Sequence, residues 1–327
     1  MKILITGGAG FVGHHVVSEC LIRGHHVDVL DCLTYASFGW DRLRNIGVGG
    51  HPKLRVYTKD ISRPFTEGLI GELGQYDAII HMAAESHVDR SIENPLRFVE
   101  TNVIGTVNML EFARRQLNLK QFIYFSTDEV FGPAHKNTKF SEWDRYNSTN
   151  PYAASKAAGE EMALAFANTY DIPVLITHCT NVFGERQHPE KFIPMTVQNL
   201  LCGRPVLINA DHGLKHIGGR YYIYAGDVAD ALLFILDRKK IDRGKLNIPG
   251  TQEINNLNLA TWIAEIMGAH METRLVDPDI GRHSHDLRYD LDGDKIAKMG
   301  WSPPVLFGSK MVRTVKWFMN NRLWLEV

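Results

Sequence analysis

Three regularly spaced glycines near the start of the chain constrain its fold more than any other feature. Gly7, Gly10 and Gly13 directly follow an apolar strand predicted over residues 2–6, and a helix is predicted from there to about Arg23. In this setting the first glycine allows a tight turn, the second lets the backbone approach a pyrophosphate, and the third lets the helix pack closely on the strand. The N–H groups and dipole of the helix N-terminus would face the phosphates. The start of the chain therefore predicts a dinucleotide-binding βαβ unit.

An acidic residue at the end of the next strand indicates which dinucleotide this unit binds. The strand predicted over residues 27–30 ends at Asp31, which lies 18 residues after Gly13. A carboxylate at this position bonds the ribose hydroxyls of adenosine and repels a 2′-phosphate, and no arginine follows it. We therefore expect NAD rather than NADP as the cofactor. A glycine turn that binds nothing is the alternative, and the succession of strand, glycines, helix, strand and acid weighs against it.

Strands and helices continue to alternate along the first half of the chain. This alternation is typical of a parallel sheet with right-handed crossover connections. We therefore expect an α/β fold, namely a Rossmann-type doubly wound parallel sheet with a smaller, mixed C-terminal substrate-binding domain. Further strands are predicted over residues 54–57, 77–81, 121–126 and 173–177, and helices near 65–74, 95–117 and 152–169.

After Asn181 the alternation weakens into longer loops rich in proline and glycine. Irregular segments beside a regular sheet commonly supply specificity. Helices are expected in this part at about 192–202 and 227–238, over 255–267, and within 281–299. The predicted NAD-binding domain covers residues 1–180, with 221–248 returning to it, and the predicted substrate domain consists of 181–220 and 249–327.

The composition excludes several classes of protein. Lys and Arg total 36 against 37 for Asp and Glu, so the chain offers no basic field to nucleic acid. No window approaches the roughly 18 uncharged apolar residues of a membrane helix. Residues 1–5 are typical of a strand rather than a signal peptide. We therefore expect a cytoplasmic protein that binds neither nucleic acid nor a membrane.

The cysteines and histidines indicate neither a disulfide framework nor a metal centre. Cys20, Cys32, Cys179 and Cys202 lie far apart without a Cys-x-x-Cys pair, so reduced thiols are expected. The His-Ser-His sequence at 283–285 could ligate a metal, but no cluster with a recognised ligand spacing accompanies it. We therefore expect no metal site.

A hydrophobic strand near the middle of the chain ends in consecutive polar residues. Residues 121–125 are followed by Ser126 and then by Thr127, Asp128 and Glu129. Ligands of an open parallel sheet bind beyond the carboxyl ends of its strands, so this segment would face a substrate. An ordinary loop or helix cap is the alternative reading.

A tyrosine and a lysine share one face of the helix that follows. Tyr152 and Lys156 are four residues apart, which lets the ammonium lie near the phenol and favour the phenolate. A tyrosine at its usual pKa of about 10 is a poor base at neutral pH, and a nearby cation makes it useful by lowering that pKa. Tyr-x-x-x-Lys is frequent by chance, and the glycine turn at the start of the chain is what favours a catalytic pair here.

The glycine turn and the Tyr152-x-x-x-Lys156 pair together resemble the extended short-chain dehydrogenase/reductase family over essentially the whole chain. The Thr-Asp-Glu run is the discriminating feature, because relatives that epimerise C4 or decarboxylate a uronic acid carry no Asp-Glu pair at this position. The stretches similar to the family's nucleotide-sugar 4,6-dehydratases are Leu33-Thr-Tyr-Ala36, Ala83-Ala-Glu-Ser-His-Val-Asp-Arg-Ser91, Ser126-Thr-Asp-Glu-Val130 and Pro189-Glu-Lys-Phe-Ile-Pro194.

The resemblance implies a role for each polar residue of the two motifs. Tyr152 takes the proton of the sugar 4-hydroxyl while hydride passes to NAD, and Lys156 lowers the pKa of the phenol. Oxidation at C4 acidifies the C5 proton, which Glu129 removes. Asp128 protonates the departing C6 hydroxyl, and Thr127 bonds the 4-oxygen. Adjacent carboxyls suit this division, because their repulsion keeps one protonated while the other ionises.

The resemblance also implies which residues bind the cofactor and the substrate. Asp60 and Ile61, at a strand end, could meet the adenine, although a turn role for them is equally open. The implied cofactor positions are Gly7, Gly10, Phe11, Val12, Gly13, Asp31, Thr34, Asp60, Ile61, Met82, Ala83, Ala84 and Ser126, together with Tyr152 and Lys156. The implied substrate positions are Ser86, His87, Arg90, Thr127, Asn181, Glu190, Lys191, Phe192, Arg220, Asn247, Arg282, His285 and Tyr289.

Some features leave the substrate open. Arg220-Tyr-Tyr222 replaces the family's Arg-Asp-Trp, the 209–219 loop is longer than usual, and 282–285 departs from Arg-Pro-Gly-His. The nucleotide therefore stays undecided among dTDP, UDP, CDP, ADP and GDP. A C4-epimerase, a uronate decarboxylase and a non-catalytic NAD-binding scaffold are the alternatives to a dehydratase. The resemblance further implies a homodimer formed through helices near 96–117 and 152–169.

Overall fold

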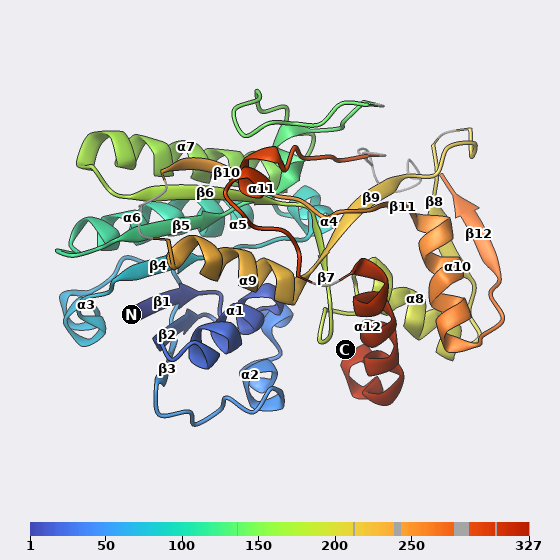
Figure 1. The fold of residues 1–327 in the computed structure, drawn as a ribbon, viewed down its shortest axis with the longest axis horizontal. Helices are drawn as coiled ribbons and strands as arrows, with labels where there is room; N and C mark the ends of the chain where they lie inside the picture. The colour runs from blue at the N-terminus through green and yellow to red at the C-terminus, as the bar shows by residue number, and fades with distance from the viewer. Residues whose placement is uncertain (136, 212, 239–242, 278–287, 305, 327) are drawn as a thin grey trace.

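The computed structural model describes residues 1–135, 137–211, 213–238, 243–277, 288–304 and 306–326 (Figure 1). A parallel sheet of seven strands, covered by helices on both faces, forms the larger part of the molecule. A smaller part, whose described residues form short strands and longer helices, lies beside it. Among the described residues no helix has the length and apolar character needed to cross a membrane.

The strand order of the large sheet is that of a doubly wound fold. The order is β10-β6-β5-β4-β1-β2-β3, and all neighbours pair in parallel. The chain winds outward in one direction from β1 and in the other from β4, so a topological switch point lies between these two strands. Ligands of such sheets bind in the crevice at this point. The strands are β1 (Lys2–Thr6), β2 (His26–Asp31), β3 (Leu54–Thr58), β4 (Ala78–His81), β5 (Gln121–Phe125), β6 (Val174–Cys179) and β10 (Gly244–Ile248).

Burial on both faces explains why the strands are continuously apolar. Ile3 and Ile5 point into one core with α1 (Phe11–Ile22) and α9 (Ala225–Leu236). Leu4 points into the opposite core, which is closed by α3 (Glu67–Leu73), α6 (Gly105–Arg114) and α7 (Pro151–Tyr170). Successive strand side chains alternate between faces, so a strand covered on both sides needs apolar residues at every position.

The helix predicted over 95–117 begins at Pro95 as expected, but it contains a π-helical turn and ends at Arg114. The structure has α4 (Val88–Glu93), α5 (Pro95–Phe98), a π-helical turn η2 (Val99–Ile104) and then α6, which ends at Arg114. Asn94 caps α5 and Pro95 occupies its first turn, so a new helix starts there. Asn102 in the wide turn is 1% exposed and donates to Ser155 Oγ over 2.8 Å, an interaction that sequence periodicity cannot reveal.

The smaller part is built from mixed short strands. A three-stranded sheet has the order β11-β9-β7, in which β9 runs antiparallel to β11 and parallel to β7, and β12 pairs with β8. The fold class predicted from the sequence is therefore confirmed. Of the predicted helix within 281–299, residues 281–287 lie outside the described residues and α11 (Asp294–Lys298) is the helix that follows. The elements are β7 (Asn181–Phe183), β8 (Val206–Asn209), β9 (Gly219–Tyr224), β11 (Glu253–Asn255), β12 (Thr273–Val276), α8 (Phe192–Leu201), α10 (Asn256–Met267) and α12 (Phe307–Asn320).

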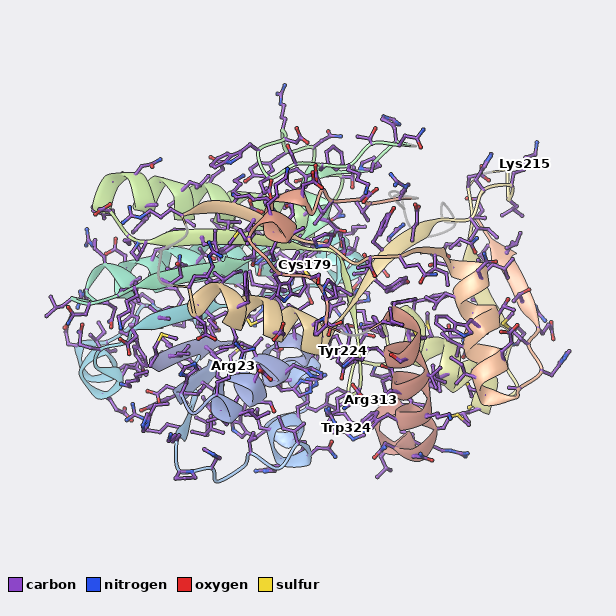
Figure 2. All side chains as sticks on the ribbon, viewed as in Figure 1. Arg23, Cys179, Lys215, Tyr224, Arg313 and Trp324 are labelled. Carbon is purple, nitrogen blue, oxygen red and sulfur yellow. The ribbon has the colours of Figure 1, made fainter. Side chains whose placement is uncertain are left out.

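A buried carboxylate ties the smaller part to the segment after β7. Tyr224 donates to Glu185 Oε2 over 2.7 Å, and Arg313 on α12 forms an ion pair with the same carboxylate. Figure 2 shows Tyr224 and Arg313 close together where β9 meets α12. Burial is the largest influence on the pKa of Glu185 and raises it. The hydrogen bond from Tyr224, a backbone hydrogen bond and the charge of Arg313 together outweigh burial and lower this pKa. The segment over residues 184–191 therefore has a fixed anchor before it reaches the cavity described next.

Candidate active site

A cavity of about 360 Å³ opens at the carboxyl ends of the central strands and collects most of the predicted site residues. It is bounded by the segments that follow β1, β2, β4, β5 and β6, which is the switch-point position. The predicted residues in its lining are Gly7, Gly10, Phe11, Val12, Gly13, Asp31, Thr34, Ile61, Met82, Ala83, Ala84, Ser86, Ser126, Thr127, Asp128, Glu129, Tyr152, Lys156, Asn181, Glu190, Lys191 and Phe192.

The remaining predicted residues lie elsewhere. Asp60 accepts from Ser62 N over 2.9 Å, which is the turn role left open from the sequence. Asn247 is fully buried, and its side-chain amide donates to the carbonyl groups of Phe140 and Asp292. It cannot reach the cavity lining without breaking these bonds, so we leave it out of the site. Arg282 and His285 lie outside the described residues.

His87 and Arg90 approach the cavity through Glu190. The carboxylate of Glu190 lies 3.7 Å from His87 Nε2 and 3.8 Å from an Arg90 nitrogen. Arg90 stacks 3.7 Å from the ring centroid of Tyr35. Arg220 and Tyr289 form a second stacked pair at 4.8 Å, on the side of the cavity where Tyr222 contributes to the lining. Arg90 contacts the cavity lining through Glu190, and the charge of Arg220 acts on Asp128 in the lining.

The turn after β5 fixes the two adjacent carboxyls. Thr127 caps the short helix η3 (Asp128–Phe131) by accepting from Glu129 N over 3.3 Å, and it donates to Asp128 Oδ1 over 3.2 Å. Asn150 donates to Glu129 Oε2 over 3.1 Å and accepts from Ala153 N over 2.8 Å. The same asparagine therefore caps α7 and orients Glu129, which couples the carboxyl pair to the helix that carries Tyr152.

Burial separates the two carboxyls chemically. Asp128 is 3% exposed, and burial followed by the neighbouring charge of Glu129 raises its pKa to about 7. The charge of Arg220 and the hydrogen bond from Thr127 oppose this shift. Asp128 is therefore a carboxylic acid that still holds its proton near neutral pH. The negative charge of the half-buried Glu129 contributes to this raised pKa.

Tyr152 and Lys156 lie on one face of α7 in the cavity lining, as predicted, but their pKa values differ from expectation. Burial first, and then the charge of Glu129, raises the pKa of Tyr152, while a hydrogen bond with Thr127 opposes the shift. Burial also lowers the pKa of Lys156 to about 7, and its ammonium donates to the carbonyl of Phe125 over 2.7 Å. Desolvation therefore dominates the pKa of Tyr152 in the chain by itself, and the lowering of that pKa by Lys156 stays a prediction.

A buried carboxylate that sequence reasoning missed supports this lysine. Glu160 is fully buried one helical turn after Lys156, and its charge raises the pKa of that lysine. Its carboxylate accepts from Ser126, from Tyr146 over 2.6 Å and from His178 Nε2 over 3.0 Å. The sequence could have indicated this contact, because Glu160 lies four residues after Lys156 and residues at this spacing share one face of a helix.

The glycine turn fits a dinucleotide. A Cβ on Gly13 would lie 2.1 Å from the carbonyl oxygen of Gly7, and one on Gly7, whose φ is +73°, would lie 2.8 Å from Ala83 N. The N-terminus of α1 has no side-chain cap at Gly10, so its N–H groups face the cavity. Asp31 at the end of β2 is held by hydrogen bonds from two backbone N–H groups. This arrangement fits a pyrophosphate beside an adenosine ribose.

Comparison with known proteins places the chain in a family. It belongs to the NAD dependent epimerase/dehydratase family, whose model matches residues 3–248. This membership confirms the predicted relationship and the prediction of NAD as cofactor.

Similar proteins include several dTDP-glucose 4,6-dehydratases. The chain is 37% identical to that of Streptomyces niveus over 337 residues, covering 100% of this chain and 95% of the relative, and 33% identical to that of Xanthomonas campestris over 348 residues, covering 99% and 94%. A structure of the Streptomyces venezuelae dTDP-glucose 4,6-dehydratase with NAD superimposes with a TM-score of 0.89 at 37% identity, covering 100% and 99% of the two chains. The UDP-glucose 4-epimerase of Thermus thermophilus matches with a TM-score of 0.85 at 27% identity, covering 98% and 99%.

Proposed function

We propose that this protein is an NAD-dependent hydro-lyase that converts a nucleoside-diphosphate-glucose to the 4-keto-6-deoxy sugar, with dTDP-glucose as the first candidate substrate. The observation that carries the proposal is Asp128, a buried carboxyl with a pKa raised to about 7 beside Glu129 in the cavity that also contains Tyr152 and Lys156. The dTDP-glucose 4,6-dehydratases similar over nearly the whole chain favour the same substrate.

Tyr152, Glu129 and Asp128 each carry out a different proton transfer in the proposed reaction. Tyr152 removes the proton of the 4-hydroxyl, and Thr127 holds the 4-oxygen beside the phenol. The glycine turn and Asp31 would hold NAD, which would supply a hydride acceptor for C4 and a hydride donor for C6. Glu129 removes the acidified C5 proton, and Asp128 gives its proton to the C6 hydroxyl, which leaves as water. Glu129 then returns a proton to C5. Tyr152 has gained one proton and Asp128 has lost one, and exchange with solvent restores both groups, so the net change is the loss of one water.

Asp128 separates this proposal from the alternatives with the same fold. Epimerisation at C4 breaks no bond at C6, and decarboxylation of a uronate loses carbon dioxide instead of a hydroxyl group. Neither reaction needs a protonated carboxyl beside a carboxylate. A scaffold that only binds NAD would need neither the acid nor the base.

Product analysis tests the proposed reaction directly. The protein is incubated with the dTDP, UDP, CDP, ADP and GDP forms of glucose, and the 4-keto product is followed by its absorbance in alkali and by mass. We expect a product lighter by one water with at least one donor. An unchanged mass with inverted C4 would identify an epimerase, and loss of carbon dioxide from a uronate would identify a decarboxylase.

The pH dependence of turnover tests the role of Asp128. Because its pKa is raised to about 7, the protonated form that can donate to the C6 hydroxyl is present below that pH and is lost above it. We expect kcat to fall about tenfold per pH unit on the alkaline side. Asp128→Asn should be slow and should lack this decline. A decline that persists in the variant would assign it to another group, such as Lys156.

The substrate residues and the domain division belong to the same proposal. We assign Ser86, Asn181, Glu190, Lys191 and Phe192 to substrate binding because they line the cavity. We also assign His87, Arg90, Arg220 and Tyr289 to the sugar diphosphate or the nucleoside. The cofactor domain and the substrate domain keep the predicted boundaries. Four free cysteines fit the proposed cytoplasmic location.

We propose that a homodimer forms through an exposed apolar surface on α4, α5 and η2. Ile92, Leu96, Val99 and Ile104 are each at least 42% exposed on α4, α5 and η2, which pack along α7. We expect Leu96→Asp to shift the protein from dimer to monomer in sedimentation experiments. Leu323→Asp, at an equally exposed leucine on η4 (Arg322–Leu325), is the control and should stay dimeric. A monomeric unmodified protein, or a dimeric Leu96→Asp, would refute this interface.

A further inference from the structure

Three buried polar atoms in the wall of the cavity have no hydrogen-bond partner among the described residues. They are Arg42 Nη2, Gln187 Oε1 and His188 Nε2, and all three residues line the same cavity as the glycine turn. A buried donor or acceptor left without a partner is costly, so native proteins rarely retain one without a ligand or water to satisfy it. Three such atoms from α2 (Asp41–Asn45) and the 184–191 segment indicate a ligand surface that the family motifs do not include.

Arg42 connects the glycine turn to the substrate side of the cavity. It is fully buried, and its Nε donates to the carbonyl of Arg186 over 3.0 Å. Its Nη1 donates to the carbonyls of Ala9 over 3.2 Å and Ala36 over 2.6 Å. Burial lowers its pKa to about 9, so it remains a cation at neutral pH. The hydrogen bonds of this buried guanidinium all go to neutral carbonyls, and its nearby anion is Asp31, so its charge is available to a further anionic ligand.

His188 and Gln187 present a donor and an acceptor beside this cation. Burial, followed by the charge of Arg42, lowers the pKa of His188 to about 4, so the ring is neutral. Its Nδ1 accepts from Glu190 N over 3.4 Å, which assigns the proton to Nε2. The ring packs against Tyr35 and Phe38 at centroid distances of 5.6 and 5.3 Å. Gln187 donates through Nε2 to the carbonyl of Val182, which leaves Oε1 as an acceptor.

We propose that Arg42 and His188 are cofactor-binding residues, with Nη2 and Nε2 donating to the pyrophosphate of NAD, and that Gln187 Oε1 accepts from a ribose hydroxyl. The pyrophosphate is the assigned partner because Arg42 is bonded to Ala9 within the turn that would bind it, and because it is the anionic part of the cofactor. Through Arg186, the same arginine links cofactor binding to the segment that carries Glu190. This inference rests on the NAD requirement of the proposed function.

Binding of NAD to variants tests the proposal without any turnover. We expect Arg42→Met to weaken NAD binding about 10- to 100-fold in calorimetric titrations. Arg42→Lys keeps the charge without the planar fork and should restore part of the affinity. Arg44→Met is the matched control on the same helix, since Arg44 is exposed and paired with Asp41. This control should bind NAD as the unmodified protein does.

His188→Phe covers the case in which Arg42→Met fails to fold. Phenylalanine keeps the ring packing and removes the Nε2 donor together with the 3.4 Å contact from Glu190 N to Nδ1. We expect about 3- to 10-fold weaker NAD binding and an unchanged melting temperature without cofactor. An NAD affinity unchanged by His188→Phe, and by Arg42→Met where that variant folds, would overturn the proposal. So would weakened binding of dTDP with NAD binding intact, which would assign these atoms to the substrate. If the unmodified protein binds NAD but releases no 4-keto product, the proposed function fails and this inference stands.

Discussion

Glu129→Gln is expected to abolish exchange of the C5 hydrogen with solvent and to slow dehydration by about 10³-fold. The side chain is proposed to be the base at C5, and an amide cannot take that proton. Glutamine still offers an oxygen to Asn150, so the cap of α7 and the position of Tyr152 are retained. NAD binding should be unchanged, because the glycine turn is untouched. Exchange is measured by mass in deuterated water.

A single-turnover experiment separates the C5 step from the C4 step in this variant. With C4 oxidation intact, the absorbance of the reduced cofactor should still appear on mixing with substrate and should persist. Glu67→Gln, at an exposed glutamate on α3, is the control and should behave as the unmodified protein. C5 exchange at the normal rate in Glu129→Gln would show that another group is the base.

Tyr152→Phe is expected to lower kcat by about 10³-fold and to remove both the reduced-cofactor absorbance and C5 exchange. Without the phenol no group takes the proton of the 4-hydroxyl, so C4 is not oxidised and the C5 proton is not acidified. The ring keeps its edge contact with Phe98, and the buried site keeps its shape. Affinity for NAD should remain within about twofold, which distinguishes a chemical defect from a binding defect.

Tyr170→Phe, at the far end of the same helix, removes an exposed phenol and should leave turnover unchanged. The decisive comparison is between Tyr152→Phe and Glu129→Gln in a single turnover. The absorbance of the reduced cofactor should be absent in the first variant and should persist in the second. If Tyr152→Phe still reduces the cofactor in a single turnover, the phenol is not the base at C4, and the assignment of Lys156 as its partner fails with it.

Local patterns predicted the sheet well because each strand carries its own signal. The predicted strands at 2–6 and 121–126 correspond to β1 and β5, since continuous apolar runs between polar loops are visible in the sequence itself. The helix predicted over 95–117 contains a π-helical turn, because Asn102 bonds a residue on α7 that is distant in sequence. The family resemblance implied a substrate role for Asn247, whereas its side-chain amide donates to the carbonyls of Phe140 and Asp292 inside the protein.

The sequence by itself determined the βαβ unit, the family, the cofactor and the two motifs proposed to be catalytic, because glycine spacing, strand alternation and helical periodicity are local properties of the chain. Only the tertiary structure decided that Asp128 holds its proton near neutral pH, that Lys156 is a weakened cation supported by Glu160, and that Arg42 and His188 share one wall of the cavity. These properties depend on desolvation and on contacts between distant segments. Both arise when the packed chain excludes water, and neither is encoded in the spacing of residues along one element.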